Sequence, residues 1–301
     1  MKRIFITLSL LLFTVVLLNA QLLYRVSGNG IEKCSYIVGT YHLAPASFAD
    51  SIPGAKSALE EVEQVGGEVD MADMASPEWQ AKVIQAMMLP EGKSLSELFS
   101  SEELTKLNAF MMNVLGADLS NPMIAAQMGK MTPMAIQNQL QLLQYMKMVP
   151  NFNPAALIDS HFQQEAMKMG KSVMGFETLD FQISVLYKGA TLERQKELLV
   201  CMLDNQEYNM MIMKELTRAY FTQDMAAILG VVEEKLGNGC DSTPEEDEAL
   251  VYGRNADWVE KIPSIVSDKS TLFVVGAAHL PGERGVIKLL EAKGYRVEAV
   301  Y

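Results

Sequence analysis

The chain contains Ser35-Tyr-Ile-Val-Gly-Thr-Tyr-His-Leu43 near its start and Leu272-Phe-Val-Val-Gly-Ala-Ala-His-Leu280 near its end. Each stretch is an apolar, β-prone run that ends in Gly-x-x-His-Leu and leads into a helical segment. This pattern predicts a buried strand with a histidine just beyond its carboxyl end, where open α/β sheets usually build their sites. Glycine before each histidine allows a sharp turn or a close backbone approach. Two of the three histidines, His42 and His279, therefore share one predicted context.

The segments around the two stretches predict the rest of a sheet. Residues 22–26 and 35–38 form a strand hairpin joined by a Gly-rich turn. A helix over 52–65 follows, with Gly66-Gly67 as its stop, and then a short strand over 68–70 that places Glu68 and Asp70 on one face. The tail predicts a strand over 271–275, a helix over 282–293 and a strand over 295–301. The fold class is α/β (mixed α+β), with a central sheet built from two related strand-Gly-x-x-His-helix modules.

The middle of the chain predicts a large helical insertion. Residues 76–148 are rich in Met, Leu, Ala and Gln, with proline breakers and a capping box at Ser100-Ser-Glu-Glu103. A helix over 154–169 completes this insertion at about residues 76–170, and Lys171–Glu177 predicts a strand that delivers a carboxylate at its end. Residues 179–260 are mostly helical. We expect one composite domain over residues 21–301.

Residues 1–20 have the layout of a secretory signal peptide. Two basic residues precede an uncharged hydrophobic run that ends in Asn19-Ala20. The chain is therefore expected to be exported to a periplasmic or extracellular compartment. The alternative is an uncleaved anchor, which would be the protein's only contact with a membrane.

The net charge and the cysteine pattern exclude some classes of partner and site. Without Lys2 and Arg3 the formal net charge falls from -12 to -14, which argues against a nucleic-acid partner. The three cysteines form no C-x-x-C pair, so no zinc-ribbon or thioredoxin signature is present. One disulfide is compatible with an oxidising compartment; Cys201 with Cys240 is one of three pairings.

Two histidines brought together by the sheet could share a metal ion. Two imidazoles with one or two carboxylates would give Zn²⁺, Mn²⁺ or Co²⁺ an open position for water. The candidate carboxylates are Glu68, Asp70 and Glu177, any one of which could instead be the general base. The alternative is that the histidines form hydrogen bonds in their loops, with the acidic residues solvated or capping a helix.

Other residues receive a structural interpretation. His161 lies on a predicted helix without the glycine context, and the 21 methionines are interpreted as core filling rather than a copper site. The chain has no Gly-x-Ser-x-Gly, H-E-x-x-H, P-loop or dinucleotide-binding fingerprint.

Five segments together resemble the TraB/PrgY/GumN family, which is similar to the Tiki metalloproteases. They are Tyr36–Leu43, Glu68–Asp70, Gly175–Gln182, Arg254-Asn255, and Val275–Gly285 with the Gly294-Tyr295 that follows; Asp159 also matches. The resemblance implies an α/β core with a helical insertion and metal-dependent hydrolase activity. It implies that His42, His279, Glu68 and Glu177 are metal ligands or catalytic residues and that Arg254 holds substrate or a developing oxyanion. It also makes Asp70, Gln182 and Asn255 candidates for substrate binding.

Three functions follow as hypotheses. The first is an exported, metal-dependent, peptidase-like hydrolase acting on a peptide or small molecule. The second is metal-free, esterase-like chemistry with His42 or His279 as the base. The third is a non-catalytic protein that binds peptides or signal molecules in a helical, Met-lined groove.

Overall fold

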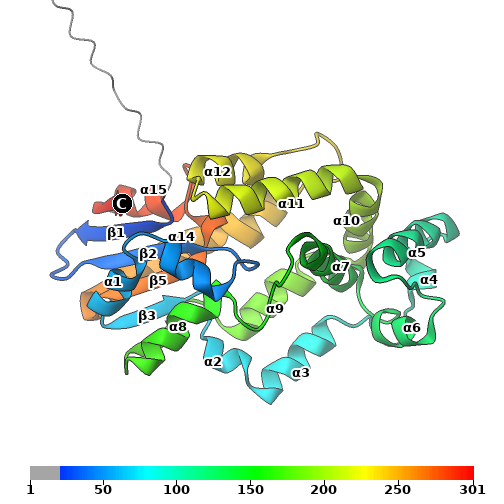
Figure 1. Ribbon diagram of the computed structural model, residues 1–301, viewed down its shortest axis with the longest axis horizontal. Helices are drawn as coiled ribbons and strands as arrows, with labels where there is room; N and C mark the ends of the chain where they lie inside the picture. The colour runs from blue at the N-terminus through cyan, green and yellow to red at the C-terminus, as the bar shows by residue number, and fades with distance from the viewer. Residues whose placement is uncertain (1–20) are drawn as a thin grey trace, which may run out of the picture.

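A computed structural model describes residues 21–301 and shows a six-stranded sheet with helices on both faces (Figure 1). The strands, in spatial order, are β4 (Ser172–Gly175), β3 (Gln64–Gly67), β5 (Thr271–Gly276), β2 (Ser35–Thr40), β1 (Leu23–Gly28) and β6 (Tyr295–Ala299). The first four run parallel, and β1 is antiparallel to both β2 and β6. The predicted mixed α/β class is confirmed. The expected signal peptide, residues 1–20, lies outside the described residues.

The two Gly-x-x-His strands are neighbours. β2 pairs with β5 in parallel, from Tyr36 opposite Leu272 to Thr40 opposite Gly276. Gly39 allows the two motifs to approach closely, because a Cβ there would lie 2.9 Å from Leu280 Cδ1 and 3.1 Å from the Ala277 backbone. The expected role of glycine as a point of close approach is confirmed at this position.

The predicted strand over 68–70 is wrong by four residues. Gly66 and Gly67, interpreted from sequence as a helix stop, lie inside β3, and the preceding helix ends at Glu61. A Cβ on Gly67 would lie 2.0 Å from the side-chain nitrogen of Gln163, so glycine is required by packing. Asp70 is therefore not on a strand face with Glu68. It caps α2 (Met71–Met74) by accepting a hydrogen bond from the Ala72 N–H.

Four helices cover the sheet. α1 (Ala55–Glu61) and α8 (Ile158–Lys168) lie on one face, and α14 (Gly253–Asp268) and α15 (Val286–Ala292) on the other, as right-handed crossovers between parallel strands require (Figure 1). The main core lies between these layers and includes the fully buried Trp258, Phe162 and Phe273. The predicted helix over 282–293 begins later, at Val286, because Gly282 adopts a φ of 86° and Gly285 is the N-cap.

The helical insertion has a core of its own, built on α4 to α7 and α10 and centred on the fully buried Leu107, Met111, Ile136 and Leu140. The predicted capping box at Ser100 and Glu103 is present at the start of α5. The remaining helical elements before α8 are η1 (Ala46–Ser51), α3 (Pro77–Ala86), α4 (Leu95–Leu98), α5 (Ser101–Leu115), α6 (Pro122–Met128) and α7 (Pro133–Met148). Between α8 and α14, and after β5, they are α9 (Leu179–Lys188), α10 (Leu192–Asp204), α11 (Gln206–Phe221), α12 (Met225–Glu233), α13 (Pro244–Asp247), the π-helix η2 (Glu248–Tyr252) and η3 (Ala277–His279).

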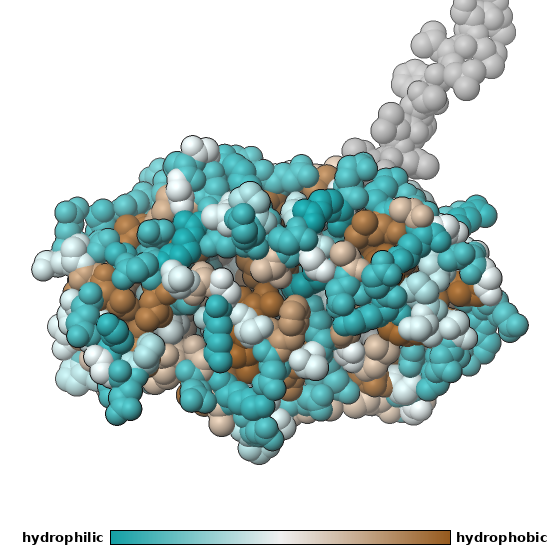
Figure 2. All heavy atoms as spheres, turned by 180° about the vertical axis from the view of Figure 1, so that it is seen from behind, coloured by the Kyte–Doolittle hydropathy of each residue, from teal (hydrophilic) through white to brown (hydrophobic). Residues whose placement is uncertain are grey.

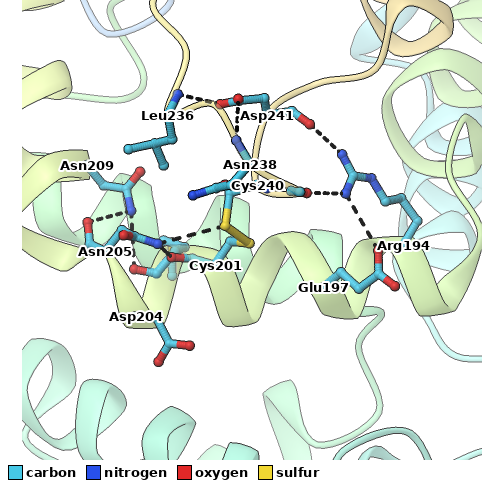
Figure 3. The surroundings of a disulfide bond; sticks show 12 residues. Arg194, Glu197, Cys201, Asp204, Asn205, Asn209, Leu236, Asn238, Cys240 and Asp241 are labelled. Atoms are coloured by element: carbon cyan, nitrogen blue, oxygen red, sulfur yellow. Dashed lines mark hydrogen bonds and ion pairs between the residues drawn. A yellow bond between two sulfur atoms is a disulfide. The ribbon is translucent and has the colours of Figure 1, made fainter.

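A disulfide crosslinks two segments of the helical region. Cys201 on α10 is bonded to Cys240 in the loop after α12, which is one of the three pairings that the sequence left open (Figure 3). Arg194 of α10 supports the same loop by donating hydrogen bonds to the carbonyl oxygens of Gly239 and Asp241. The disulfide thus anchors the segment that leads through α13 and η2 into α14.

On the face shown in Figure 2, the surface is mainly hydrophilic, with apolar side chains in separate patches. Among the described residues, no helix is both long and apolar enough to span a membrane.

Candidate active site

Four neighbouring parallel strands each deliver one predicted site residue. Glu177 follows β4, Glu68 follows β3, His279 follows β5 and His42 follows β2. Because the carboxyl ends of parallel strands meet at one edge of a sheet, these residues gather there although the chain separates them widely. Arg254, at the start of α14, reaches into the same edge.

Arg254 joins the two glutamates. Its Nη2 lies 2.6 Å from Glu68 Oε2, and its Nε and Nη2 lie 2.7 and 2.9 Å from the two carboxylate oxygens of Glu177. The carboxylates also accept hydrogen bonds from the Gly276 N–H, 2.8 Å from Glu68 Oε1, and from the indole N–H of Trp258, 2.8 Å from Glu177 Oε1. The three charged side chains are at most 13% exposed, so this is a buried, hydrogen-bonded ion network.

Gln182, predicted as substrate-binding, extends this network. Its side-chain nitrogen lies 3.3 Å from Glu68 Oε2 and 3.2 Å from Glu177 Oε2, so it bridges the two carboxylates from α9. Burial opposes the ionisation of Glu68, but the positive charges of Arg254 and His42 and the hydrogen bond from the Gly276 N–H hold the pKa of Glu68 below its usual value. Glu68 is therefore an anion at neutral pH.

His279 is held as a neutral imidazole. Asn255 donates its amide N–H to the Arg284 carbonyl at 2.9 Å, which turns its oxygen toward His279 Nδ1 at 2.6 Å. This assignment makes Nδ1 the protonated nitrogen and Nε2 the acceptor, 3.3 Å from Arg254 Nη1. Burial, against the ring of Trp258, lowers the pKa of His279 to about 4. Asn255 is itself fully buried, so its contacts favour a positioning role over direct contact with substrate.

His42 has the opposite environment. Its side chain is 72% exposed, and Nδ1 lies 3.1 Å from Asp159 Oδ1. The same oxygen accepts a 2.6 Å hydrogen bond from the Thr40 hydroxyl. The Asp159 carboxylate raises the pKa of His42 to about 9 by charge attraction and hydrogen bonding, so the imidazolium form is favoured at neutral pH.

Asp159 and Thr40 are site residues to which the sequence gave no role. Asp159 lies in the first turn of α8, where the helix dipole favours a carboxylate. The sequence signal that could have found it was its match to the family pattern. The helical insertion also positions this part of the site, because Tyr145 of α7 donates a 3.0 Å hydrogen bond to the carbonyl of Leu43, beside His42.

The two histidines and most of the charged network line one cavity of about 580 Å³. Of the predicted site residues, it brings together His42, Glu68, Gln182, Arg254 and His279. Glu177 and Asp70 line a neighbouring cavity of about 420 Å³ instead. A larger groove of about 1230 Å³ runs between α5, α7, α11 and α12 in the helical region, away from the histidines. The 580 Å³ cavity is the best candidate active site, because the two histidines with shifted pKa values and the buried ion network meet there.

The predicted metal ligands do not form a metal site in this arrangement. Every carboxylate oxygen of Glu68 and Glu177 accepts a hydrogen bond, and Arg254 places a positive charge between them. His279 Nε2 lies 3.3 Å from the same guanidinium, whose positive charge disfavours a cation at that nitrogen. Within residues 21–301, no three His, Cys, Asp or Glu side chains are grouped to hold a metal ion. A divalent cation would first require Arg254 to leave.

The protein is therefore an α/β protein whose candidate site is assembled from several strand ends. Two Gly-x-x-His loops, two glutamates that follow strands and a buried arginine make up this site. The chain belongs to the TraB/PrgY/gumN family, whose sequence profile matches residues 22–299. No curated protein and no solved structure matches the chain.

Proposed function

We propose that the 580 Å³ cavity is the active site of a hydrolase that cleaves an ester or amide with water, using the two Gly-x-x-His histidines as base and acid. The observation that carries this proposal is the contrast between their hydrogen bonds. His279 is held with Nε2 as an acceptor, as a base requires. His42 is held against a carboxylate, as a proton donor requires. Paired groups whose environments push their pKa values apart identify acid and base.

The first step is attack of water on the substrate carbonyl carbon. His279 Nε2 accepts a proton from the water as the new C–O bond forms, and the carbonyl oxygen becomes negative. Arg254 Nη1 makes no contact with either glutamate; it donates a 3.1 Å hydrogen bond to the Leu250 carbonyl and lies 3.3 Å from His279 Nε2, which is long for a hydrogen bond. A developing oxyanion beside His279 could accept the second Nη1 N–H in place of the imidazole, with the guanidinium plane held by the two carboxylates.

The second step is collapse of the tetrahedral intermediate. The bond to the leaving oxygen or nitrogen breaks, and protonated His42 donates its Nε2 proton to that atom. One water is consumed, and a carboxylic acid and an alcohol or amine are produced. His279 returns its proton to solvent and His42 takes one up, so the resting state is restored.

The decisive experiment compares three matched variants, His42→Asn, His279→Asn and His161→Asn, in hydrolysis of p-nitrophenyl acetate and of a peptide mixture. We expect each site variant to lose about 10²- to 10⁴-fold in kcat, while His161→Asn, on α8 outside the cavity, keeps its activity. Circular dichroism establishes that all three fold. Equal activity in all three variants would sink the proposal.

The metal-dependent, peptidase-like hydrolase that the sequence suggests remains a separate hypothesis. The same assay, run after chelation and then with added Mn²⁺, Co²⁺ or Zn²⁺, distinguishes it from the metal-free chemistry. Activity that survives chelation supports the histidine mechanism. Activity that appears only with an added ion would transfer support to the metal enzyme and imply that Arg254 moves.

A second candidate function is capture of a peptide or signal molecule without cleavage. The groove of about 1230 Å³ between the helices favours it, because Met210 and Met211 line the groove and flexible thioethers suit adaptable binding. Tight binding to the native protein with an unchanged ligand mass after long incubation would support this function over hydrolysis.

We also propose that the protein works after export. The Cys201–Cys240 disulfide supports this, because such bonds persist mainly in oxidising compartments. A protein isolated from its native cells with both thiols reduced would argue against export.

A further inference from the structure

The lining of the cavity has a polar and an apolar part, called here the polar wall and the apolar wall. The polar wall consists of the groups described above, from the strand ends and from α8, α9 and α14. The apolar wall comes from three separate segments: α2, the loop before α8, and α9. Its residues are Met71, Met74, Pro154, Ala155, Leu157, Val185 and Leu186. Leu186 is 44% exposed, so its side chain is accessible to a molecule bound in the cavity.

The cations of the polar wall are already paired with carboxylates. Arg254 lies against both Glu68 and Glu177, which together leave one excess negative charge, and His42 is paired with Asp159. A negatively charged group on the substrate would therefore lose its hydration without gaining a free counter-charge in the cavity. An uncharged group would not incur this cost.

The neighbouring cavity reinforces this selection. It is lined by Asp70, Asp73, Glu78 and Asp180, with Lys82 as the cation among its lining residues. Lys82 is itself bound to Asp180 and Glu78. The lining of the neighbouring cavity is therefore negative overall, and this charge disfavours an anionic group nearby.

We infer that the site selects substrates whose acyl group is uncharged and apolar, and that this group lies against the wall formed by α2, α9 and the loop before α8. The inference rests on the proposed function and adds the substrate class to it. With the carbonyl oxygen at Arg254 Nη1, the acyl chain lies across the cavity toward Leu186 and Val185. The leaving group then points toward the exposed His42.

The test is a series of p-nitrophenyl esters from acetyl to hexanoyl, with the succinyl ester as a charged counterpart of the butyryl ester. We expect kcat/KM to rise about threefold to fourfold for each methylene that becomes buried, and the succinyl ester to be at least tenfold poorer than the butyryl ester. Leu186→Ala should lower the hexanoyl-to-acetyl ratio at least threefold. The matched control is Met123→Ala on α6, which truncates a 71% exposed side chain outside the cavity and should leave the ratio unchanged.

A binding series separates this inference from the hydrolase proposal, because it requires no turnover. N-acyl glycinamides from acetyl to hexanoyl are titrated by calorimetry into the native protein and Leu186→Ala. Affinity that rises with chain length and falls in Leu186→Ala, without ester cleavage, would support the apolar site and overturn the hydrolase. Esters cleaved at equal kcat/KM with no chain-length effect on binding would overturn the substrate class and leave the hydrolase standing. No binding and no cleavage would overturn both.

Discussion

Replacing Arg254 by methionine should destabilise the protein severely at neutral pH. The substitution keeps an unbranched side chain of similar length but removes the cation that contacts Glu68 and Glu177 at 2.6 to 2.9 Å. It leaves two buried carboxylates, 13% and 2% exposed, without their counter-charge. Breaking a buried ion pair in this way costs about 3–5 kcal/mol in free energy of unfolding. The matched control is Arg218→Met, whose pair with Glu215 is about half exposed and should contribute about 0–1 kcal/mol.

The loss of stability in Arg254→Met should depend on pH in a defined direction. In the native protein the pKa of Glu68 is below its usual 4.5, so the group stabilises the fold above that pH and loses this contribution as the pH falls through its folded pKa. Without Arg254, burial still opposes the ionisation of Glu68 and one compensating positive charge is gone, so we expect the folded pKa of Glu68 to rise. The variant should therefore recover stability on acidification from pH 7.5 to 5, by about 1.4 kcal/mol for each unit by which the folded pKa is raised within that window.

Urea unfolding followed by circular dichroism at pH 7.5 and pH 5 measures both effects. We expect the free energy of unfolding of Arg254→Met to be lower than that of the native protein by several kcal/mol at pH 7.5, and this difference to be clearly smaller at pH 5. Adding Glu68→Gln to the variant should recover part of the loss at pH 7.5, because one uncompensated charge is gone. A gap that stays constant or widens on acidification would refute the view that Arg254 compensates buried carboxylates.

Three further predictions concern other contacts. Asp159→Asn should lower the pKa of His42 from about 9 toward 6.5, and an NMR titration of the imidazole checks this; an unmoved midpoint would mean that another group sets it. Reducing or replacing the disulfide as Cys201→Ser with Cys240→Ser should cost up to about 4 kcal/mol, the chain-entropy value for a sequence separation of 39, as a lower urea midpoint. Gly67→Ala should cost about 1–3 kcal/mol by overpacking against a buried glutamine of α8; a wild-type melting temperature would show that β3 can shift.

The sequence predicts strand-end positions well because a local pattern determines them. An apolar run ending in Gly-x-x-His identifies β2 and β5 without any knowledge of their partners, and the structure pairs the two strands in parallel. The same logic places Glu177 after β4. It fails at β3, where Gly66 and Gly67 have the composition of a helix stop. A side chain at position 66 would crowd Phe273, and one at position 67 would overlap Gln163 of α8. Both neighbours lie far along the chain, so no local signal distinguishes a strand from a helix stop here.

The contacts between site residues are harder to predict than their positions. Asp159 reaches Thr40 and His42 across a separation of 119 residues from Thr40, and only the docking of α8 on the sheet brings them together. The sequence also treats Glu68, Glu177 and Arg254 as independent candidates. That the guanidinium lies between the two carboxylates depends on where α14 begins relative to β3 and β4, and this follows from the packed core and not from spacing along the chain.

The two Gly-x-x-His motifs are equivalent in sequence and complementary in structure, and this difference has a physical origin. After β5 the histidine turns inward, against Trp258, and burial disfavours its charged form. After β2 the histidine stays at the mouth of the cavity, where the α8 carboxylate of Asp159 favours the charged form. Each pKa is therefore set by a helix packed beside its strand, and not by the motif itself. A repeated motif placed in unlike surroundings can supply both an acceptor and a donor of protons, as hydrolysis requires.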